Sequence, residues 1–408
     1  MGSGIRQTEE GMCSYGKSIA MRPTSIYVHI PFCERHCAYC DFNVYTMKKW
    51  GDLPERTVDA ICSEIRRAAT TLQHDIVVPT IFFGGGTPTF LRADALAQIV
   101  QTVRDSFTVE NEAEITAEAN PATSDAAKFE QMRVDGFNRL SIGVQSFNDS
   151  LLRSLDRTHS SHEALAALRA ARSVGFSNVS LDLMFRLPGQ LMEDWLQSLE
   201  TAVSLKPEHI SLYGLTLEPG TRFERLYAGG RLQLPDEELE AAMYEGAIAL
   251  LKQLGYHHYE VSNFARPGFE SRHNRVYWDN GEYLGFGPGA VSYFAGRRWK
   301  VERVPLRYVE KAACGADMVV EDETLPSHQA LAESLMVGIR QLDGLNLGRL
   351  SARYAINVEN YYIDELKQLQ QDGLITLNSG VVKLTHRGLL VADTVASAFI
   401  RLPSIGAV

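Results

Sequence analysis

The chain has 408 residues, of which 45% are hydrophobic, so it can bury one large core and a smaller second domain. Its formal net charge of -10 disfavours nonspecific binding to nucleic acid, and we expect no nucleic-acid partner. Three of its 6 cysteines lie in one short segment, unlike the framework of a disulfide-stabilised secreted protein. Without an apolar run near the roughly 18 residues of a membrane span, or a secretory leader, we expect a cytoplasmic location.

Residues 25–263 alternate between short apolar runs and longer segments with helical spacing. The apolar runs predict buried strands at 26–30, 80–83, 115–118, 139–144, 179–184 and 209–215. The segments between them predict helices at 55–72, 93–103, 125–134, 161–173 and 191–205. Repeated strand–helix units predict an α/β fold with a parallel sheet and outer helices. Six units are too few for a closed eight-stranded barrel, so we expect a partial (β/α)6 barrel with functional groups where the strands end.

The rest of the chain predicts three further units. Residues 1–24 predict a disordered N-terminal extension. Residues 264–325 are rich in arginine, glycine and aromatic residues without a clear period, and predict a loop-rich connector. Residues 326–408 predict a small α+β domain, with helices at 330–341, 346–354 and 360–371 and a hairpin of 374–377 and 381–385. Helices followed by a hairpin are typical of a winged-helix module, which we expect here to cover its neighbour rather than bind DNA.

Cys33, Cys37 and Cys40 follow the first predicted strand with Cys-x3-Cys-x2-Cys spacing. Thiolates are the usual ligands of iron–sulfur clusters, and three of them can hold three irons of a [4Fe–4S] cube. The fourth iron is then open to the amino nitrogen and carboxylate of S-adenosylmethionine (SAM), which an electron from the cluster cleaves to a 5′-deoxyadenosyl radical. The spacing therefore predicts radical SAM chemistry. The alternative is a structural zinc site with His29 or His36 as fourth ligand, although the second cysteine pair usual in such sites is missing.

A glycine-rich segment, Gly84-Gly85-Gly86-Thr87-Pro88-Thr89, ends the second predicted strand. Glycines let the backbone approach a ligand closely and expose N–H groups to it. Alone, the segment would be interpreted as a plain glycine turn. Because it follows the cysteine triad on the next strand, it favours a SAM-binding loop.

These motifs resemble those of the radical SAM superfamily, and within it the group around oxygen-independent coproporphyrinogen III oxidase. The resemblance covers residues 27–40, 84–89, 118–121, 139–147 and 187–190. In that group, polar side chains at strand ends bind SAM, where a carboxylate accepts from ribose or ammonium and an arginine pairs with the methionine carboxylate. The resemblance implies that SAM is bound by Tyr27, Gly85, Gly86, Thr87, Glu118, Gln145, Arg157 and Asp182.

Two departures from the oxidase indicate the HemW family of heme chaperones instead. Phe42 stands where the oxidase has a further cysteine, and the arm before the triad is short. Downstream, residues 273–278 carry the His-Asn-x-x-Tyr-Trp pattern, which in HemW proteins is associated with heme. A neutral imidazole can ligate heme iron, and aromatic rings can pack on the macrocycle. The resemblance therefore implies a heme site formed by His273, Asn274, Tyr277 and Trp278.

Several neighbours bear on this heme site. Arg272 or Arg275 could pair with heme propionates, whereas His257 and His258 are rival ligands on an apparent strand. Three positions differ from the family pattern and leave the heme coordination and the SAM affinity open: Ser271 for a common cysteine, Val291 for a common histidine and Arg186 for a glycine.

The resemblance implies a heme chaperone that carries the cluster and SAM and delivers heme to hemoproteins, including membrane-associated ones. It leaves a homodimer and a peripheral position at the membrane open. The alternative is an enzyme that oxidatively decarboxylates coproporphyrinogen III, and a third hypothesis is a radical SAM enzyme with an unrelated substrate. Whether the protein is an enzyme stays open at this point.

Overall fold

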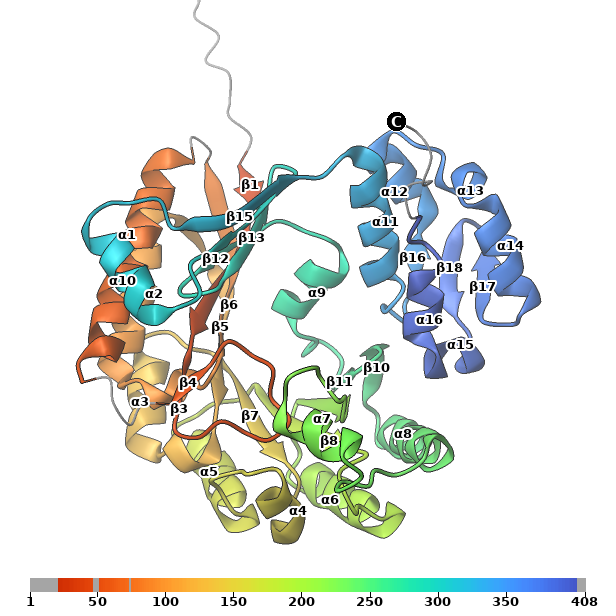
Figure 1. Cartoon of the computed structure of the whole chain (residues 1–408), viewed down its shortest axis with the longest axis horizontal. Coiled ribbons are helices and arrows are strands. Elements are labelled where there is room, and N and C mark those ends of the chain that lie inside the picture. Colours follow the sequence, from red (N-terminus) through yellow and green to blue (C-terminus); the bar gives the residue numbers. More distant parts are fainter. Residues whose placement is uncertain (1–20, 47–50, 73–74, 402–408) are drawn as a thin grey trace, which may run out of the picture.

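The core of the protein is one curved sheet, seen at the centre of Figure 1. The computed structural model describes residues 21–46, 51–72 and 75–401. Six parallel strands form the middle of the sheet in chain order. They are β2 (Ser25–Ile30), β5 (Ile76–Gly85), β6 (Thr108–Ala119), β7 (Arg139–Gln145), β8 (Val179–Phe185) and β9 (His209–Gly214). The predicted partial barrel of six parallel strands is therefore confirmed.

Strand β7 illustrates why these segments become strands with a polar inner face. Leu140, Ile142 and Val144 are fully buried, as expected for side chains that pack under the outer helices. Residues between them alternate to the other face of the sheet, where Ser141 and Gln145 line the cavity inside the barrel. The two-residue period thus separates an apolar outer layer from a polar interior.

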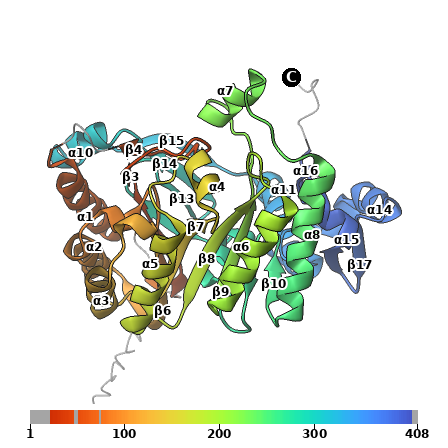
Figure 2. The same ribbon diagram turned by 90° about the horizontal axis from the view of Figure 1, so that it is seen from below.

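Helices cover the outer face of the sheet in an arc (Figures 1 and 2). They are α1 (Leu53–Thr71), α2 (Ala93–Ser106), α3 (Ala126–Val134), α5 (Ser161–Ser173), α6 (Met192–Ser204) and α8 (Glu237–Gln253). Two short helices, α4 (Asp149–Ser154) and α7 (Arg222–Ala228), lie at the end of the barrel where the parallel strands finish (Figure 2). The short strands β3 (Phe32–Cys33) and β4 (Tyr45–Thr46) lie at that same end.

The expectation of a loop-rich connector over 264–325 is wrong, because this segment extends the central sheet. β12 pairs in parallel with β2, and β13, β14 and β15 continue the sheet as antiparallel strands. The segment contains β11 (Asn263–Ala265), α9 (Arg272–Trp278), β12 (Tyr283–Phe286), β13 (Val291–Phe294), β14 (Arg297–Val301), α10 (Pro305–Ala313) and β15 (Val319–Thr324). Strands this short, joined by tight turns, are too brief to show a clear period in the sequence.

Helix α9 connects the two sides of the sheet. The chain leaves β11, which pairs with β9 and with β10 (His257–Glu260), and enters β12 beside β2. Between these strands α9 packs against β5 on one side and α11 on the other. The helix therefore lies between the barrel and the C-terminal unit (Figure 1).

The C-terminal unit has its own apolar core, which includes Leu331, Leu335, Leu366 and Val382. Its elements are α11 (Ser327–Gly338), β16 (Leu345–Asn346), α12 (Leu347–Tyr354), α13 (Val358–Tyr361), α14 (Ile363–Gln371), β17 (Ile375–Asn378), β18 (Val381–Leu384), α15 (His386–Leu390) and α16 (Ala392–Ser397). The predicted hairpin is present as β17 and β18, with β16 added as a third strand. The helix predicted over 360–371 is interrupted at Tyr362, whose φ of -109° and ψ of 28° are not helical.

The N-terminal extension is only partly within the described residues. Residues 1–20 lie outside them. The expectation of disorder is wrong for residues 22–23, because β1 (Arg22–Pro23) pairs with β5 and Arg22 forms an ion pair with Glu282. In the described part of the chain, no helix is both long enough and apolar enough to cross a lipid bilayer.

Candidate functional site

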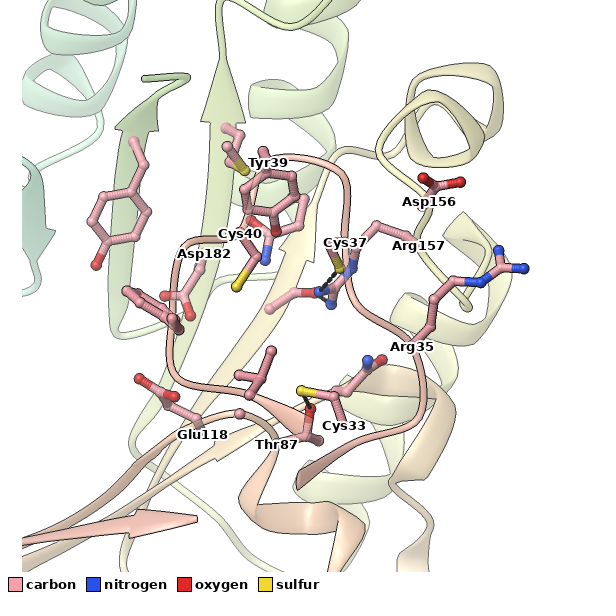
Figure 3. A pocket seen from close by; sticks show the side chains of 18 of the residues that line it. Cys33, Arg35, Cys37, Tyr39, Cys40, Thr87, Glu118, Asp156, Arg157 and Asp182 are labelled. Carbon is pink, nitrogen blue, oxygen red and sulfur yellow. Dashed lines mark hydrogen bonds between the residues drawn. The ribbon is translucent and has the colours of Figure 1, made fainter. Parts of the chain in front are cut away.

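A pocket of about 440 Å³ opens where the parallel strands end (Figure 3). It gathers side chains from the cysteine loop and from the ends of β5, β6, β7, β8 and β9. The structure thus brings together every residue predicted for the cluster and for SAM except Tyr27: Cys33, Cys37, Cys40, Gly85, Gly86, Thr87, Glu118, Gln145, Arg157 and Asp182.

The cysteine loop is closed at its base and anchored at its middle. β3 and β4 pair, so the chain that carries the thiols leaves and returns side by side. The Ala38 N–H donates to the Leu155 carbonyl at 3.3 Å, and the Ala38 carbonyl accepts from the Phe223 N–H at 3.0 Å. The ends of α4 and α7 therefore hold the loop from outside the barrel.

The three thiols face a common space in Figure 3, and all are free. In the part of the chain that the structure describes, no three His, Cys, Asp or Glu side chains are arranged to hold one metal ion. Thiols spread around a volume suit a [4Fe–4S] cluster, whose irons are separate, so this donor set fits the cluster. Burial raises the pKa of the Cys33 thiol, and that of Cys40 to about 12, so we expect iron binding to release protons.

Both histidines considered for the zinc alternative are engaged elsewhere. His29 is buried, with Nδ1 at 3.0 Å from the Tyr27 hydroxyl and Nε2 at 3.1 Å from the Asn43 carbonyl. His36 is exposed, and its Nε2 lies 2.9 Å from the Cys40 carbonyl. Neither of these two histidines is therefore free to serve the triad as a fourth ligand.

The glycine-rich loop is tied to the strand that enters the cysteine loop. The Gly86 N–H donates to the Ile30 carbonyl at 2.8 Å, and the Thr87 hydroxyl lies 3.4 Å from the Cys33 sulfur. Gly85 has a φ of +107°, and a Cβ there would lie 2.4 Å from Cε1 of His29. Only glycine fits this position, so the loop can present its backbone to a ligand beside the thiols.

Two partly buried carboxyl groups face the pocket, and desolvation raises the pKa of both. Glu118 accepts a hydrogen bond from the Gly85 N–H at 3.2 Å, and burial together with the nearby Asp182 raises its pKa to about 8. Asp182 accepts hydrogen bonds from the Ser141 hydroxyl at 3.0 Å and the Ser180 hydroxyl at 3.2 Å. At neutral pH Glu118 can therefore donate a hydrogen bond to a ligand, whereas the hydroxyl groups that donate to Asp182 favour the charged form of that carboxyl and oppose the rise in its pKa.

Replacement of Glu118 by glutamine is expected to flatten the dependence of stability on pH. A carboxyl whose pKa is raised by folding keeps a proton that the unfolded chain releases, so the wild type loses stability as the pH rises from about 4.5 toward 8. Glutamine is neutral throughout this range. Thermal unfolding between pH 5 and pH 8 measures the effect, with exposed Glu112→Gln on the same strand as control. Parallel pH profiles for wild type and Glu118→Gln would contradict the assignment.

A second cavity, of about 230 Å³, adjoins the pocket inside the barrel. The two cavities share Glu118, Ser141, Asp182 and Tyr213. Tyr27, the SAM-binding residue missing from the first cavity, lines the second. So do three of the four residues predicted to bind heme: His273, Asn274 and Tyr277.

His273, the predicted heme ligand, is buried in this structure, and both of its ring nitrogens have hydrogen-bond partners. It is 1% exposed, and its Nδ1 lies 2.7 Å from the hydroxyl of Thr80, which itself donates to Ser25. This pattern assigns the proton to Nδ1, so Nε2 accepts from the Tyr277 hydroxyl at 3.1 Å. Burial lowers the pKa of His273 to about 3, so the ring is neutral. Iron can reach Nε2 only after Tyr277 moves.

Trp278, the fourth predicted heme residue, is directed to the C-terminal unit instead of the cavity. The guanidinium of Arg340 lies over its ring at 5.1 Å from the ring centre. The turn after α9 also contacts the C-terminal unit, because the Asn280 side chain donates to the hydroxyl of Ser334 on α11 at 2.9 Å. Helix α9 therefore joins the barrel interior to the C-terminal unit.

The cations considered for heme propionates already have acidic partners. Arg272 forms an ion pair with Glu110 at 3.1 Å, and Arg275 forms one with Asp343 at 3.6 Å. The remaining positions noted in the sequence have structural contacts: His257 with Glu270 and Asp343, His258 stacked on Phe264, Ser271 capping α9, Val291 at the start of β13 and Arg186 paired with Glu240.

Sequence reasoning missed several pocket residues. Tyr213 lies at the end of the sixth parallel strand and lines both cavities, and Arg139 lines the inner one although it is 2% exposed. Their signal was available, because both follow the inward alternation of their strands. Gln145 and Asp156 adopt φ values of +65° and +59° at the pocket, and such backbone strain clusters at functional sites.

Known proteins match the chain over nearly its whole length. A model of the radical SAM superfamily matches residues 27–202, and one of the HemN C-terminal domain matches residues 325–391. The heme chaperone HemW of Bacillus subtilis (strain 168) is 38% identical, covering 92% of this chain and 99% of its own. That of Mycobacterium tuberculosis (strain CDC 1551 / Oshkosh) is also 38% identical, covering 92% and 94%. Among solved structures, the radical SAM enzyme coproporphyrinogen III oxidase (HemN) from Escherichia coli has a TM-score of 0.81 at 25% identity, covering 93% and 90%.

Proposed function

The chain belongs to the HemW family of the radical SAM superfamily, and on this basis we propose that it is a heme chaperone. It carries a [4Fe–4S] cluster and SAM, and it delivers heme to hemoproteins. The cofactor part of the proposal is carried by the pocket in which the three thiols meet the glycine-rich loop and two partly buried carboxyl groups, and the heme-delivery part rests on the HemW relatives. These residues are spread over positions 33–182 of the sequence, and the radical SAM fold brings them together in one pocket.

The residues of the pocket divide the work of holding the cofactors. Cys33, Cys37 and Cys40 would hold the cluster, which when bound supplies an electron for the cleavage of SAM. The backbone of the glycine-rich loop lies beside these thiols, where it can face the amino acid part of SAM. Glu118, whose pKa is about 8, can donate a hydrogen bond to its polar groups, and the carboxyl oxygens of Asp182 can accept one.

A second candidate is a radical SAM enzyme that acts on a porphyrinogen. It is favoured by the TM-score of 0.81 with coproporphyrinogen III oxidase and by the intact SAM pocket. Phe42 counts against it, because this side chain lines the pocket at the position where the oxidase has a further cysteine. The chaperone remains the function that we propose.

One comparison separates the two functions. The protein is purified without oxygen, its cluster is reconstituted, and heme is added in one arm. Coproporphyrinogen III, SAM and a reductant are added in the other arm. We expect stoichiometric heme uptake, transfer of that heme to an apo-hemoprotein, and no protoporphyrinogen. Conversion of coproporphyrinogen without heme uptake would establish the enzyme instead.

We also propose that heme reaches His273 only when Tyr277 releases its ring. Tyr277→Phe removes the hydroxyl bonded to Nε2 and is expected to raise heme affinity about 2- to 10-fold, the range of one hydrogen bond. His273→Ala is expected to remove the features of the heme spectrum that depend on coordination of the iron by histidine. Heme titration followed by the Soret band measures both, with the neighbouring Tyr283→Phe as control. Unchanged heme spectra and affinity in His273→Ala would place the ligand elsewhere.

The proposed function includes two further statements, about the location of the recipient hemoproteins and about the oligomeric state. We propose that some recipients are membrane-associated and that the chaperone meets them at the membrane surface. We also propose a homodimer. Vesicle co-sedimentation and the molar mass of the reconstituted protein in solution test these two statements separately.

A further inference from the structure

The guanidinium of Arg157 lies against the cysteine loop. Its Nη1 donates to the sulfur of Cys37 at 3.7 Å, and its Nη2 donates to the Gly143 carbonyl at 2.8 Å (Figure 3). Arg157 follows α4 and is separated from Cys37 by 120 positions in the sequence. The contact is therefore a tertiary one, made by packing α4 beside the loop.

Arg157 has no carboxylate partner within the described residues. Its neighbour Asp156 forms an ion pair with Arg222 of α7. Among the described ion pairs, none includes Arg157. The guanidinium contacts a thiol and a carbonyl instead, so its positive charge acts on the sulfur side of the pocket.

The remaining charges of the pocket make this cation important. Besides Glu118, which keeps its proton near neutral pH, five acidic residues line the pocket: Glu34, Asp41, Asp156, Asp182 and Glu218. The cations of the lining are Arg35 and Arg157, and Arg35 is exposed and extends away from the thiols (Figure 3). Arg157 is therefore the cation of the lining that directly contacts a predicted cluster ligand.

A cluster held by three thiolates carries negative charge, and its reduction adds one electron and one more unit of negative charge. A nearby positive charge stabilises the reduced form more than the oxidised form, and this effect is stronger where water is excluded. Hydrogen bonds to the ligand sulfurs and the local net charge are the main protein contributions to the potential of such clusters. The position of Arg157 supplies both contributions at Cys37.

We propose that Arg157 raises the reduction potential of the cluster by donating a hydrogen bond to Cys37 and by offsetting the acidic lining of the pocket. This role is in addition to the contact with the methionine carboxylate that the family resemblance implies. It rests on the cluster-binding part of the proposed function and is independent of heme delivery. The two roles of Arg157 can be separated, because the potential is measurable before SAM is added.

The test is a redox titration of the full, reconstituted chain without SAM, followed by the electron paramagnetic resonance signal of the reduced cluster. At the potential where half of the wild-type cluster is reduced, Arg157→Gln is expected to lower the ratio of reduced to oxidised cluster at least tenfold. For a one-electron couple this corresponds to a midpoint about 59 mV lower. Arg157→Lys keeps the charge but cannot reproduce both bonds of the planar guanidinium, so its midpoint should lie between the two.

Arg153→Gln is the matched control, because Arg153 is exposed and lies four residues earlier, on α4. Its midpoint should equal that of the wild type. A fully loaded Arg157→Gln protein with the wild-type midpoint would overturn the proposal. If Arg157→Gln does not retain iron, Arg157→Lys decides, and a wild-type midpoint in that variant would overturn the proposal. If the Arg157 variants show the expected midpoint shifts but the wild-type protein does not deliver heme, the result would count against the chaperone function and not against this proposal.

Discussion

Cys37→Ser is expected to purify without its iron–sulfur cluster after reconstitution under conditions that load the wild type with about four irons per chain. Serine offers a poor ligand for iron in place of a thiolate, and the two remaining cysteines cannot hold the cube. Iron, acid-labile sulfide and visible absorbance measure the loss. Circular dichroism should stay unchanged, because the loop keeps its backbone anchors at Ala38.

Cys314→Ser is the matched control for this experiment. Cys314 is exposed and lies outside the pocket, so its replacement should leave the iron content unchanged. Equal iron in Cys37→Ser and Cys314→Ser would refute the cysteine triad as the cluster site. Iron retained without sulfide would instead favour a mononuclear metal site.

Gly86→Ala is expected to weaken SAM binding at least tenfold and to lower stability by roughly 1–3 kcal/mol, the usual cost of overpacking. A Cβ at Gly86 would lie 2.7 Å from the Phe32 carbonyl oxygen and 2.9 Å from that of Ile30. These are backbone atoms of the segment that leads to Cys33, so relief of the clash must move the cluster loop. Thermal unfolding and calorimetric titration with SAM measure the two effects.

Gly246→Ala shows what the same substitution does where space is available. Gly246 lies within α8, and its nearest neighbour would be a methyl group of Leu196 at 3.9 Å. We expect this variant to bind SAM normally and to gain up to about 1 kcal/mol of stability, because alanine favours helices. If both alanine variants behaved alike, the close approach at Gly86 would have no importance for the site.

Prediction from sequence succeeded where one local signal decides the structure. Strands whose outer face packs under helices carry a regular set of apolar residues, and the segment at 179–184 lies within β8 (Val179–Phe185). The cluster loop was equally local, because its three thiols are separated by three and two residues. Glycines at 84–86 and polar strand ends then located the pocket, since parallel strands all end at one edge.

Prediction failed where distant segments decide the structure. The sequence around His273 does not predict its hydrogen bond with Thr80, which is 193 positions away. An aromatic loop near the surface and a buried helix packed on β5 have the same composition, so the exposure of the motif could not be predicted. The strands β12 to β15 were missed for a related reason, because only pairing with β2 defines them.

The position of β2 between β5 and β12 has a consequence for biosynthesis. Residues 25–30 leave the ribosome early, but their second neighbour, residues 283–286, follows roughly 10–50 s later at usual elongation rates. Until then β2 presents an open edge, which can pair with other chains. The cysteine loop also depends on residues made late, because Asn43 donates hydrogen bonds to the carbonyls of Pro288 and Arg303. We therefore expect the cysteine loop to reach its final form only after residue 303 has been synthesised, and we expect a chain shortened before residue 283 to be prone to aggregate.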